Sequence, residues 1–263
     1  MTAIAAGPRM SGAAGRLANK RIIVTGGASG IGLSIALRIR HEGGCVGLID
    51  RDSRSLGEAI EQLGGTSKTV TSRVGDLLDT SVPATAIESL TDHLGGLDGI
   101  VCVAGVLHSS PVLDYDVADW NRIIGINLTG AFLCAQAAGR LMRAAGTGGS
   151  IVMISSSLAV LGSRERAAYV ASKAGMLGVM KTFALELGDL SIRCNAIAPG
   201  LVETPLATGN IERSYLAAWG SRTALGRIGK PEDIAPTACF LLSDESGWIT
   251  GQTIHIDGGF VFR

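Results

Sequence analysis

Short runs of aliphatic and β-branched residues alternate along the chain with longer segments in which apolar residues recur at helical spacing. The short runs predict seven strands, over residues 21–25, 45–50, 69–76, 97–105, 150–156, 192–200 and 252–259. The periodic segments predict helices over about 31–42, 53–63, 82–94, 117–145 and 231–243, with a further helix around 169–173. The pattern is less regular over 205–221.

Strands that alternate with helices at this spacing predict βαβ units, in which a parallel sheet is covered on both faces. Right-handed crossovers then give a doubly wound arrangement. We therefore expect an α/β fold: a single-domain, doubly wound (Rossmann-type) parallel seven-stranded sheet with helices on both faces. We expect residues 1–17 to form a flexible N-terminal tail. We expect residues 18–263 to form one domain, because no linker or internal repeat divides them.

Composition and charge argue against several classes of function. The chain has 263 residues, 46% of them hydrophobic, and a formal net charge of zero, so neither a basic surface for nucleic acid nor an acidic tail is indicated. No apolar run reaches transmembrane length, and the first residues lack the apolar centre of a signal peptide. The five scattered cysteines form no CxxC pair, which favours buried, reduced thiols in a cytoplasmic protein. We expect no catalytic metal, no nucleic-acid partner and no membrane partner.

A glycine-rich segment, TGGASGIG at residues 25–32, joins the first strand to the first helix. Gly26, Gly30 and Gly32 allow a tight turn and a close approach of the backbone to a pyrophosphate, and the helix that follows points its free N–H groups at that anion. Because the segment follows a strand and opens a helix, it indicates a dinucleotide site rather than an ordinary strand–helix turn. The domain over 18–263 is then a dinucleotide-binding one.

Asp50 ends the second predicted strand, twenty residues after Gly30. A carboxylate there can accept hydrogen bonds from the adenosine ribose hydroxyls and would repel a 2′-phosphate, which favours NAD over NADP. Arg51 keeps NADP as an alternative, because a guanidinium at the next position could pair with that phosphate. A helix cap or a solvated loop acid is the structural alternative for Asp50.

Tyr169 and Lys173 lie four residues apart, so on a helix they share a face. A free phenol titrates near pH ~10, and a nearby ammonium favours its phenolate form, so the pair can exchange a proton with an alcohol or carbonyl oxygen. A surface pair on an amphipathic helix is the alternative. Three serines, 155–157, end the preceding strand, and strand alternation would turn the outer two away from Ser156. Ser157 stays a second candidate, because alternation lapses beyond the strand.

These motifs resemble those of the short-chain dehydrogenase/reductase family, over about residues 17–259. The family's glycine motif matches TGGASGIG, and its active-site motif matches Tyr169-x-x-x-Lys173 with a serine thirteen residues before the tyrosine, which is Ser156. Its buried asparagine matches Asn127.

A further motif of the family, PG…T, matches Pro199, Gly200 and Thr204. One segment departs from the pattern. The family usually has Asn-Asn-Ala-Gly after the fourth strand, whereas this chain has residues 102–105, Cys-Val-Ala-Gly. The small pair that lets a cofactor approach is kept, but any hydrogen bonds made by the two amide side chains must be replaced or absent.

The resemblance implies a role for each catalytic residue. Tyr169 would be the general acid in reduction and the base in oxidation, and Lys173 would lower its pKa and hold the nicotinamide ribose. Ser156 would donate a hydrogen bond to the substrate oxygen, and Asn127 would anchor a water that relays protons from Lys173. The implied cofactor-binding residues are Gly26, Ser29, Gly30, Ile31, Gly32, Asp50, Arg51, Asp76, Leu77, Ala104, Gly105, Tyr169, Lys173, Pro199, Gly200, Val202 and Thr204.

Ligands of such sheets lie beyond the carboxyl ends of the strands, so three loops, 106–113, 158–168 and 201–221, should shape a substrate pocket. The third loop is predicted to close as a lid. The predicted substrate-binding residues are Ser156, Leu158, Tyr169, Leu206 and Tyr215. Arg164 could bind a substrate carboxylate, or it could be a solvated loop charge.

The favoured function is hydride transfer between NAD(H) and a secondary alcohol or ketone. Two alternatives stay open: an NADPH-dependent reductase resembling the 3-oxoacyl carrier-protein reductases, and a non-catalytic nucleotide-binding regulatory module on the same fold. The resemblance also implies a homotetramer, packed through the long helices and the last strand. The apolar end GFVFR, residues 259–263, would suit such an interface.

Overall fold

A seven-stranded parallel sheet forms the centre of the computed structural model, which describes residues 15–208 and 213–261. The strands lie in the order β3-β2-β1-β4-β5-β6-β7, so the predicted doubly wound fold is confirmed. Their bounds are β1 Arg21–Thr25, β2 Cys45–Asp50, β3 Val70–Val74, β4 Gly99–Cys102, β5 Gly149–Ile154, β6 Ile192–Pro199 and β7 Thr253–Ile256. Successive strands are added to one side of β1 up to β3 and to its other side from β4 onward, so the strand order reverses between β1 and β4, where a doubly wound fold binds its ligand.

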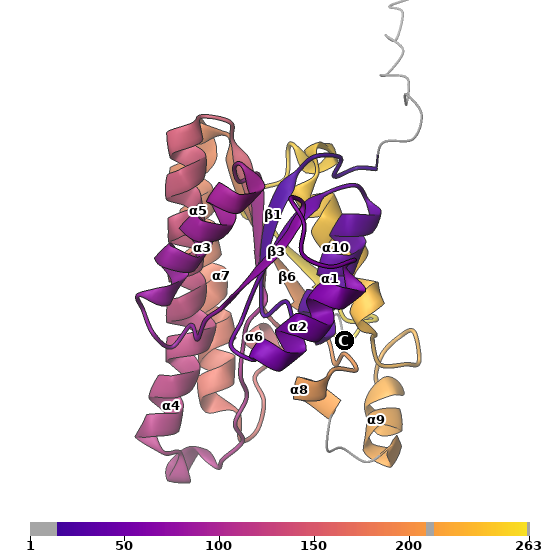
Figure 1. The fold of residues 1–263 in the computed structure, drawn as a ribbon. Coiled ribbons are helices and arrows are strands. Elements are labelled where there is room, and N and C mark those ends of the chain that lie inside the picture. Colours follow the sequence, from indigo (N-terminus) through magenta and orange to yellow (C-terminus); the bar gives the residue numbers. More distant parts are fainter. Residues whose placement is uncertain (1–14, 209–212, 262–263) are drawn as a thin grey trace, which may run out of the picture.

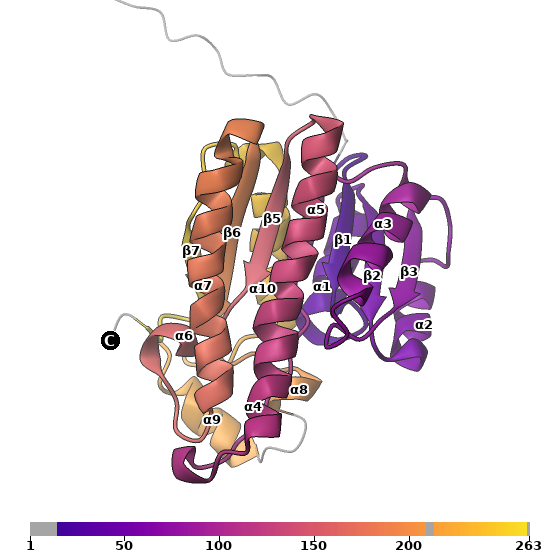
Figure 2. The same ribbon diagram turned by 90° about the vertical axis from the view of Figure 1, so that its left-hand side faces the viewer.

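Helices cover both faces of the sheet (Figures 1 and 2). One face is covered by α1 (Gly30–His41), α2 (Ser53–Gln62) and α10 (Pro231–Leu242), and the other by α3 (Val82–Leu94), α5 (Ala131–Ala145) and α7 (Ala167–Leu187). Short helices α6 (Leu158–Leu161), α8 (Pro205–Thr208) and α9 (Arg213–Gly220) follow the ends of β5 and β6. The two short helices α8 and α9 occupy the segment whose sequence pattern is irregular.

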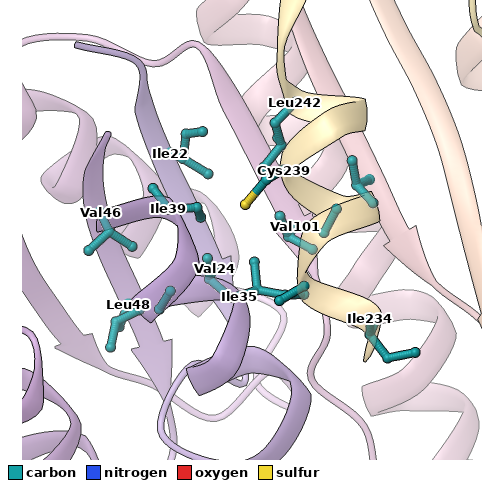
Figure 3. Close-up of a cluster of buried hydrophobic side chains, with 14 of the residues drawn as sticks. Ile22, Val24, Ile35, Ile39, Val46, Leu48, Val101, Ile234, Cys239 and Leu242 are labelled. Carbon is teal, nitrogen blue, oxygen red and sulfur yellow. The ribbon is translucent and has the colours of Figure 1, made fainter. Parts of the chain in front are cut away.

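Each face has its own hydrophobic core. Between α1, α10 and the sheet, Figure 3 shows the buried side chains of Ile22, Val24, Ile35, Ile39, Val46, Leu48, Val101, Ile234, Cys239 and Leu242. Full burial of one aliphatic side chain of this size contributes roughly 1.5–3 kcal/mol. The sheet is therefore clamped from both sides, and the loops at its strand ends start from fixed positions.

The helix predicted over 117–145 is continuous but not regular (Figure 2). It consists of α4 (Val117–Ile124), a π-helical turn η2 (Gly125–Gly130) and α5. A Cβ on Gly130 would lie 2.9 Å from the Leu77 Cβ, so glycine lets this turn approach the loop after β3. The wider turn carries Asn127, whose side chain is fully buried. π-turns of this kind are frequent at functional sites.

Strands β3 to β7 end earlier than their hydrophobic runs predict. β4 stops at Cys102 instead of 105, because the backbone N–H groups of Val103 and Ala104 donate to the Thr25 Oγ1, at 3.1 and 3.3 Å. β5 stops at Ile154, before the serines. Within the described ranges, no helix has the length and apolar character needed to span a membrane.

The domain begins before the predicted boundary between residues 17 and 18. Leu17 is fully buried in the core beneath α1, and the Arg16 guanidinium donates two hydrogen bonds to the Glu42 carboxylate, at 2.9 and 2.7 Å. Arg38 also pairs with Glu42, and these two partners outweigh the effect of burial and hold the pKa of Glu42 below its usual value. Residues 1–14 of the predicted tail lie outside the described residues.

We expect Leu17→Ala to lower the free energy of unfolding by about 2–5 kcal/mol, because it deletes a fully buried side chain and leaves a cavity. Urea denaturation followed by circular dichroism measures the change. Leu113→Ala is the matched control, since Leu113 is 94% exposed and its loss should change stability by less than about 0.5 kcal/mol. Equal stability of the two variants would show that the segment before β1 contributes nothing to the fold.

Candidate active site

A cleft of about 420 Å³ opens at the carboxyl ends of the strands, near the point between β1 and β4 where the strand order reverses. It is lined by every residue that the sequence analysis assigned to cofactor binding: Gly26, Ser29, Gly30, Ile31, Gly32, Asp50, Arg51, Asp76, Leu77, Ala104, Gly105, Tyr169, Lys173, Pro199, Gly200, Val202 and Thr204. Residues that the sequence analysis did not assign complete the wall, among them Asp52, Val103, Val106 and Ile154. They lie at or just after strand ends and belong to no sequence motif that would have identified them.

The glycine-rich turn between β1 and α1 leaves no room for side chains. Gly26 has φ +65°, and a Cβ there would lie 2.8 Å from the Ala104 Cα. A Cβ on Gly32 would collide with the carbonyl oxygen of Gly26, and one on Gly30 would lie 3.1 Å from the Thr204 Cγ2. The turn therefore exposes bare backbone to the cleft at the N-terminus of α1. This cradle fits the pyrophosphate of a dinucleotide.

Asp50 lies at the end of β2 with its carboxylate oriented by backbone groups. It accepts hydrogen bonds from the N–H of Ala28 at 3.1 Å and of Asp52 at 3.2 Å. The first bond ties the carboxylate to the glycine-rich turn, and the oxygens retain capacity to accept further hydrogen bonds. Asp52 rather than Asp50 caps α2, since its side chain accepts from the N–H of Arg54 and Ser55. Asp50 is therefore placed to contact a ligand.

Residues 102–105 lack the two asparagines that the family usually has there, and Thr25 accepts hydrogen bonds from this segment instead. Thr25 Oγ1 accepts the two hydrogen bonds from Val103 and Ala104 described above, and this fixes the loop after β4 against β1. Cys102 is buried, and burial raises the pKa of its thiol to about 12. The thiol therefore stays protonated and serves as a small apolar side chain.

Lys173 and Asn127 lie close together beside the loop after β4. The Lys173 Nζ donates to the carbonyl oxygen of Ile154 at 2.7 Å. The Asn127 Oδ1 accepts from the N–H of Val106 at 2.8 Å, and its Nδ2 donates to the carbonyl oxygen of the same residue at 2.9 Å. A Cβ on Gly105 would lie 3.3 Å from the Asn127 Oδ1 and 3.6 Å from the Lys173 Nζ. Only glycine fits between them with ease.

Hydrogen bonding distinguishes the three serines after β5. The Ser155 hydroxyl donates to the carbonyl oxygen of Lys173 at 2.8 Å, which ties the strand end to α7. The Ser157 hydroxyl donates to the carbonyl oxygen of Ala198 at 3.3 Å. The Ser156 Oγ accepts a hydrogen bond from the N–H of Leu158 at 3.2 Å, and it lies near enough to the Tyr169 hydroxyl to lower the pKa of that group. Ser155 and Ser157 therefore fasten the fold, and Ser156 is the serine that reaches the tyrosine.

The electrostatics differ from the sequence-based expectation of an acidic phenol. Burial raises the pKa of Tyr169, and the opposing effects of the Ser156 hydrogen bond and the Arg166 charge do not cancel it. Burial also lowers the pKa of Lys173 to about 8. The Lys173 Nζ lies 5.9 Å from the centre of the tyrosine ring. Burial is the largest cause of both shifts, because it disfavours the charged form of each group.

A second cavity, of about 80 Å³, adjoins the cleft, and Ser156 and Tyr169 line both. Leu158 and Leu206, predicted to bind substrate, line it too. Tyr215, the remaining predicted residue, belongs to α9, but its side chain lies outside the described part of the structure. The rest of the described wall is Leu107, Ser157, Arg166, Pro199, Gly200, Leu201, Ala207, Trp219 and Phe260. The wall is mostly apolar, as the predicted loops indicate.

Phe260 reaches the cavity because Asp257 fixes the turn after β7. The Asp257 carboxylate accepts hydrogen bonds from the N–H groups of Gly259, Phe260 and Val261, at 2.9, 3.2 and 3.0 Å. The ring of Phe260 packs 5.3 Å from that of Trp219, centre to centre. The sequence analysis assigned this apolar end to a subunit interface, and no local pattern links it to a pocket.

Two polar residues of the predicted pocket loops lie away from the small cavity. His108 faces α4, with its Nε2 3.4 Å from the Asp119 Oδ2. Arg164 is exposed and lines neither cavity. In the part of the chain that the structure describes, no three His, Cys, Asp or Glu side chains gather in a group able to hold a metal ion.

Comparisons with known proteins agree with this geometry. A family model described as enoyl-(acyl carrier protein) reductase matches residues 26–261. The 3-oxoacyl-(acyl-carrier-protein) reductase of Thermotoga maritima is 37% identical over 246 residues, which cover 94% of this chain and 99% of that protein. The (3R)-3-hydroxyacyl-CoA dehydrogenase of Canis lupus familiaris is 34% identical over 252 residues, 93% of this chain and 97% of that one.

Among solved structures, a short-chain type dehydrogenase/reductase from Mycobacterium marinum superposes with a TM-score of 0.88. It is 32% identical in sequence, and the match covers 94% of this chain and 97% of that one. The match of the family model and of near full-length relatives extends over the cleft, the glycine-rich turn and the Tyr169–Lys173 pair. The chain therefore belongs to the short-chain dehydrogenase/reductase family of oxidoreductases.

Proposed function

We propose that the protein transfers hydride between NAD(H) and a secondary alcohol or ketone. The observation that carries this proposal is the position of Ser156 and Tyr169 on the shared wall of the two cavities. A substrate oxygen in the small cavity and a nicotinamide in the large cleft would meet at these two hydroxyls. Lys173 lines the large cleft directly behind them.

The residues of the large cleft fit a dinucleotide. The bare backbone of the glycine-rich turn would hold the pyrophosphate, Asp50 the adenosine ribose, and Lys173 the nicotinamide ribose. Thr204 and the backbone after Pro199 would hold the carboxamide. When bound, the nicotinamide supplies the acceptor or donor for the hydride, and the protein supplies placement and proton transfer.

Tyr169 is the proton-transferring group in this proposal. Because burial raises its pKa, the hydroxyl is protonated at neutral pH and can donate its proton to the oxygen of a ketone as that oxygen gains charge. In the oxidation of an alcohol, the same oxygen would have to accept a proton, which needs the phenolate. Ser156 lines the same two cavities as Tyr169 and would donate a hydrogen bond to the substrate oxygen.

Lys173 supplies charge at the base of the site. Its pKa of about 8 keeps it mostly protonated at neutral pH, so it can stabilise developing negative charge on Tyr169. Asn127 holds the loop after β4 beside it through Val106. We propose that protons reach Lys173 from solvent along this side, through a water bound near Asn127.

One alternative has a specific observation in its favour. The Thermotoga maritima relative is named as a 3-oxoacyl-(acyl-carrier-protein) reductase, and Arg51 lines the cleft next to Asp50, where it could pair with a 2′-phosphate. Asp50 supports NAD(H) instead, because its carboxylate faces the glycine-rich turn and would repel that phosphate. A purely regulatory nucleotide-binding module would have no use for a buried lysine one helical turn from a half-buried tyrosine.

We also propose a homotetramer in the cytoplasm. Apolar side chains are exposed on α4 and α7, namely Val117, Trp120 and Leu185, and β7 leaves one edge of the sheet without a strand partner among the described residues. All five cysteines are free and four of them are buried, which supports a reducing compartment.

We expect Tyr169→Phe to reduce kcat for ketone reduction by about 10²–10⁴-fold, because it removes the proton donor and leaves the ring in place. NADH oxidation against a panel of ketones measures kcat, and quenching of tryptophan fluorescence measures NADH binding, which should stay within about threefold of the wild type. Tyr115→Phe is the matched control, since the Tyr115 hydroxyl donates only to the His108 carbonyl oxygen, at 3.4 Å. Undiminished turnover by Tyr169→Phe would remove the proposed mechanism.

We expect the wild type to prefer NADH, and Asp50→Asn to raise the ratio of kcat/KM for NADPH over NADH by at least about tenfold. The amide keeps an oxygen for the Ala28 N–H but loses the charge that repels a 2′-phosphate. Steady-state kinetics with both cofactors measures the ratio, and Asp52→Asn is the control for a charge change in the same loop. A strong preference of the wild type for NADPH that Arg51→Ala abolishes would support the alternative instead.

The lowered pKa of Lys173 makes stability depend on pH. Because the pKa falls from 10.5 to about 8, the unfolded chain binds more protons than the native protein between these values, so the free energy of unfolding rises with pH there. We expect the wild type to gain roughly 1–3 kcal/mol relative to Lys173→Met between pH 8 and 10. Urea denaturation at each pH measures the difference, and parallel curves for the two proteins would contradict a buried, desolvated ammonium.

A further inference from the structure

Arg166 is the charged residue of the small cavity. It immediately precedes α7, three residues before Tyr169, and both residues line the cavity. Among the lining residues that the structure describes, no other carries a charge. Leucines, Trp219 and Phe260 form most of the remaining wall. A partly buried guanidinium thus faces an apolar space that ends at the reacting hydroxyls.

This guanidinium has no ion-pair partner among the described residues, in contrast to other arginines of the chain. Arg16 pairs with Glu42, Arg21 with Asp98, and Arg227 with Asp233. A cation that is partly removed from water loses hydration, and a ligand that carries a negative charge would compensate for that loss. The planar N–H groups of arginine match a carboxylate in particular.

The charge of Arg166 also acts at the reaction centre. It lowers the pKa of Tyr169, although less strongly than burial raises it. The guanidinium therefore lies within electrostatic reach of the phenol oxygen. A group bound to it would share the small cavity with a substrate oxygen held by Ser156 and Tyr169.

We propose that the substrate is a short oxo acid, or the corresponding hydroxy acid, whose free carboxylate binds Arg166. This inference rests on the proposed function and names its substrate class. The cavity of about 80 Å³ is far below the ~300–1,000 Å³ of drug-sized ligand sites, which favours a small molecule over a steroid. The apolar wall would hold the short carbon chain between the two polar ends.

The reaction is balanced with the groups already named. In reduction, a hydride from NADH adds to the carbonyl carbon, the π electrons of the C=O bond move to its oxygen, and that oxygen takes the proton of Tyr169. NAD⁺ and the hydroxy acid are formed, and the phenolate regains its proton from solvent. The carboxylate takes no part in bond making and serves to position the carbonyl.

The experiment compares acetoacetate with methyl acetoacetate, which differ in the charge that Arg166 would bind. We expect wild-type kcat/KM to be at least about tenfold higher for the acid. Arg166→Gln should lower kcat/KM for acetoacetate about 10–100-fold more than it lowers kcat/KM for the ester, mainly by raising KM for the acid. Arg166→Lys should restore part of the loss, because it keeps the charge but not the planar donors. Arg164→Gln is the matched control, since Arg164 is exposed and lines neither cavity.

A second readout does not depend on turnover. In the NADH-loaded protein, isothermal titration calorimetry should detect butanoate and not butanamide, and Arg166→Gln should abolish the difference. An Arg166→Gln variant that loses the same factor on acid and ester, or that still distinguishes butanoate from butanamide, would overturn the inference. Turnover of neutral ketones with no preference for acids would overturn it too, while leaving the proposed function intact. Failure to reduce any ketone would reject the proposed function, and the butanoate titration would still decide the role of Arg166.

Discussion

The buried ammonium of Lys173 is the constraint on which the site depends. It is held by the carbonyl oxygen of Ile154, at the end of β5, and lies near Asn127 beside Gly105, where a Cβ would come within 3.3 Å of the Asn127 Oδ1. Ser155 adds a second tie between the strand and α7. These contacts fix the register of α7, and with it the height at which Tyr169 meets Ser156. Burial then sets the pKa of both titrating groups, so the same packing that positions the pair determines its chemistry.

Much of the fold could be predicted because the chain is locally consistent. Strands β1 and β2 and helix α3 have the predicted bounds, since apolar periodicity and glycine or proline boundaries agree there. The π-turn at Asn127 could not be predicted, because residues 117–145 have an unbroken helical pattern and the distortion comes from packing against the loop after β3. The early end of β4 likewise depends on Thr25, a residue far away in sequence.

For the site, sequence motifs identified the residues but could not predict their pKa values. The glycine-rich turn, Asp50 and the Tyr169–Lys173 spacing are local patterns that the sequence shows directly, and all of them line one cleft in the structure. The pKa of Tyr169 could not be predicted, because its direction depends on how deeply the phenol is buried. Arg164 and Arg166 are two arginines of the same loop, and the sequence does not distinguish them. Arg166 lines the cavity because α7 begins directly after it. Phe260 enters it through a turn made by Asp257.

The charges of the site affect one another. Arg166 stabilises the phenolate of Tyr169, and an anion bound to Arg166 would cancel part of that stabilisation. A substrate carboxylate would therefore raise the pKa of Tyr169 further and keep its proton in place until the carbonyl oxygen gains charge. A phenolate next to a bound carboxylate is the state in which reduction ends and from which oxidation begins, so their repulsion raises the energy of that state in both directions. If the substrate is an acid, the guanidinium that selects it therefore also offsets this repulsion at the reaction centre.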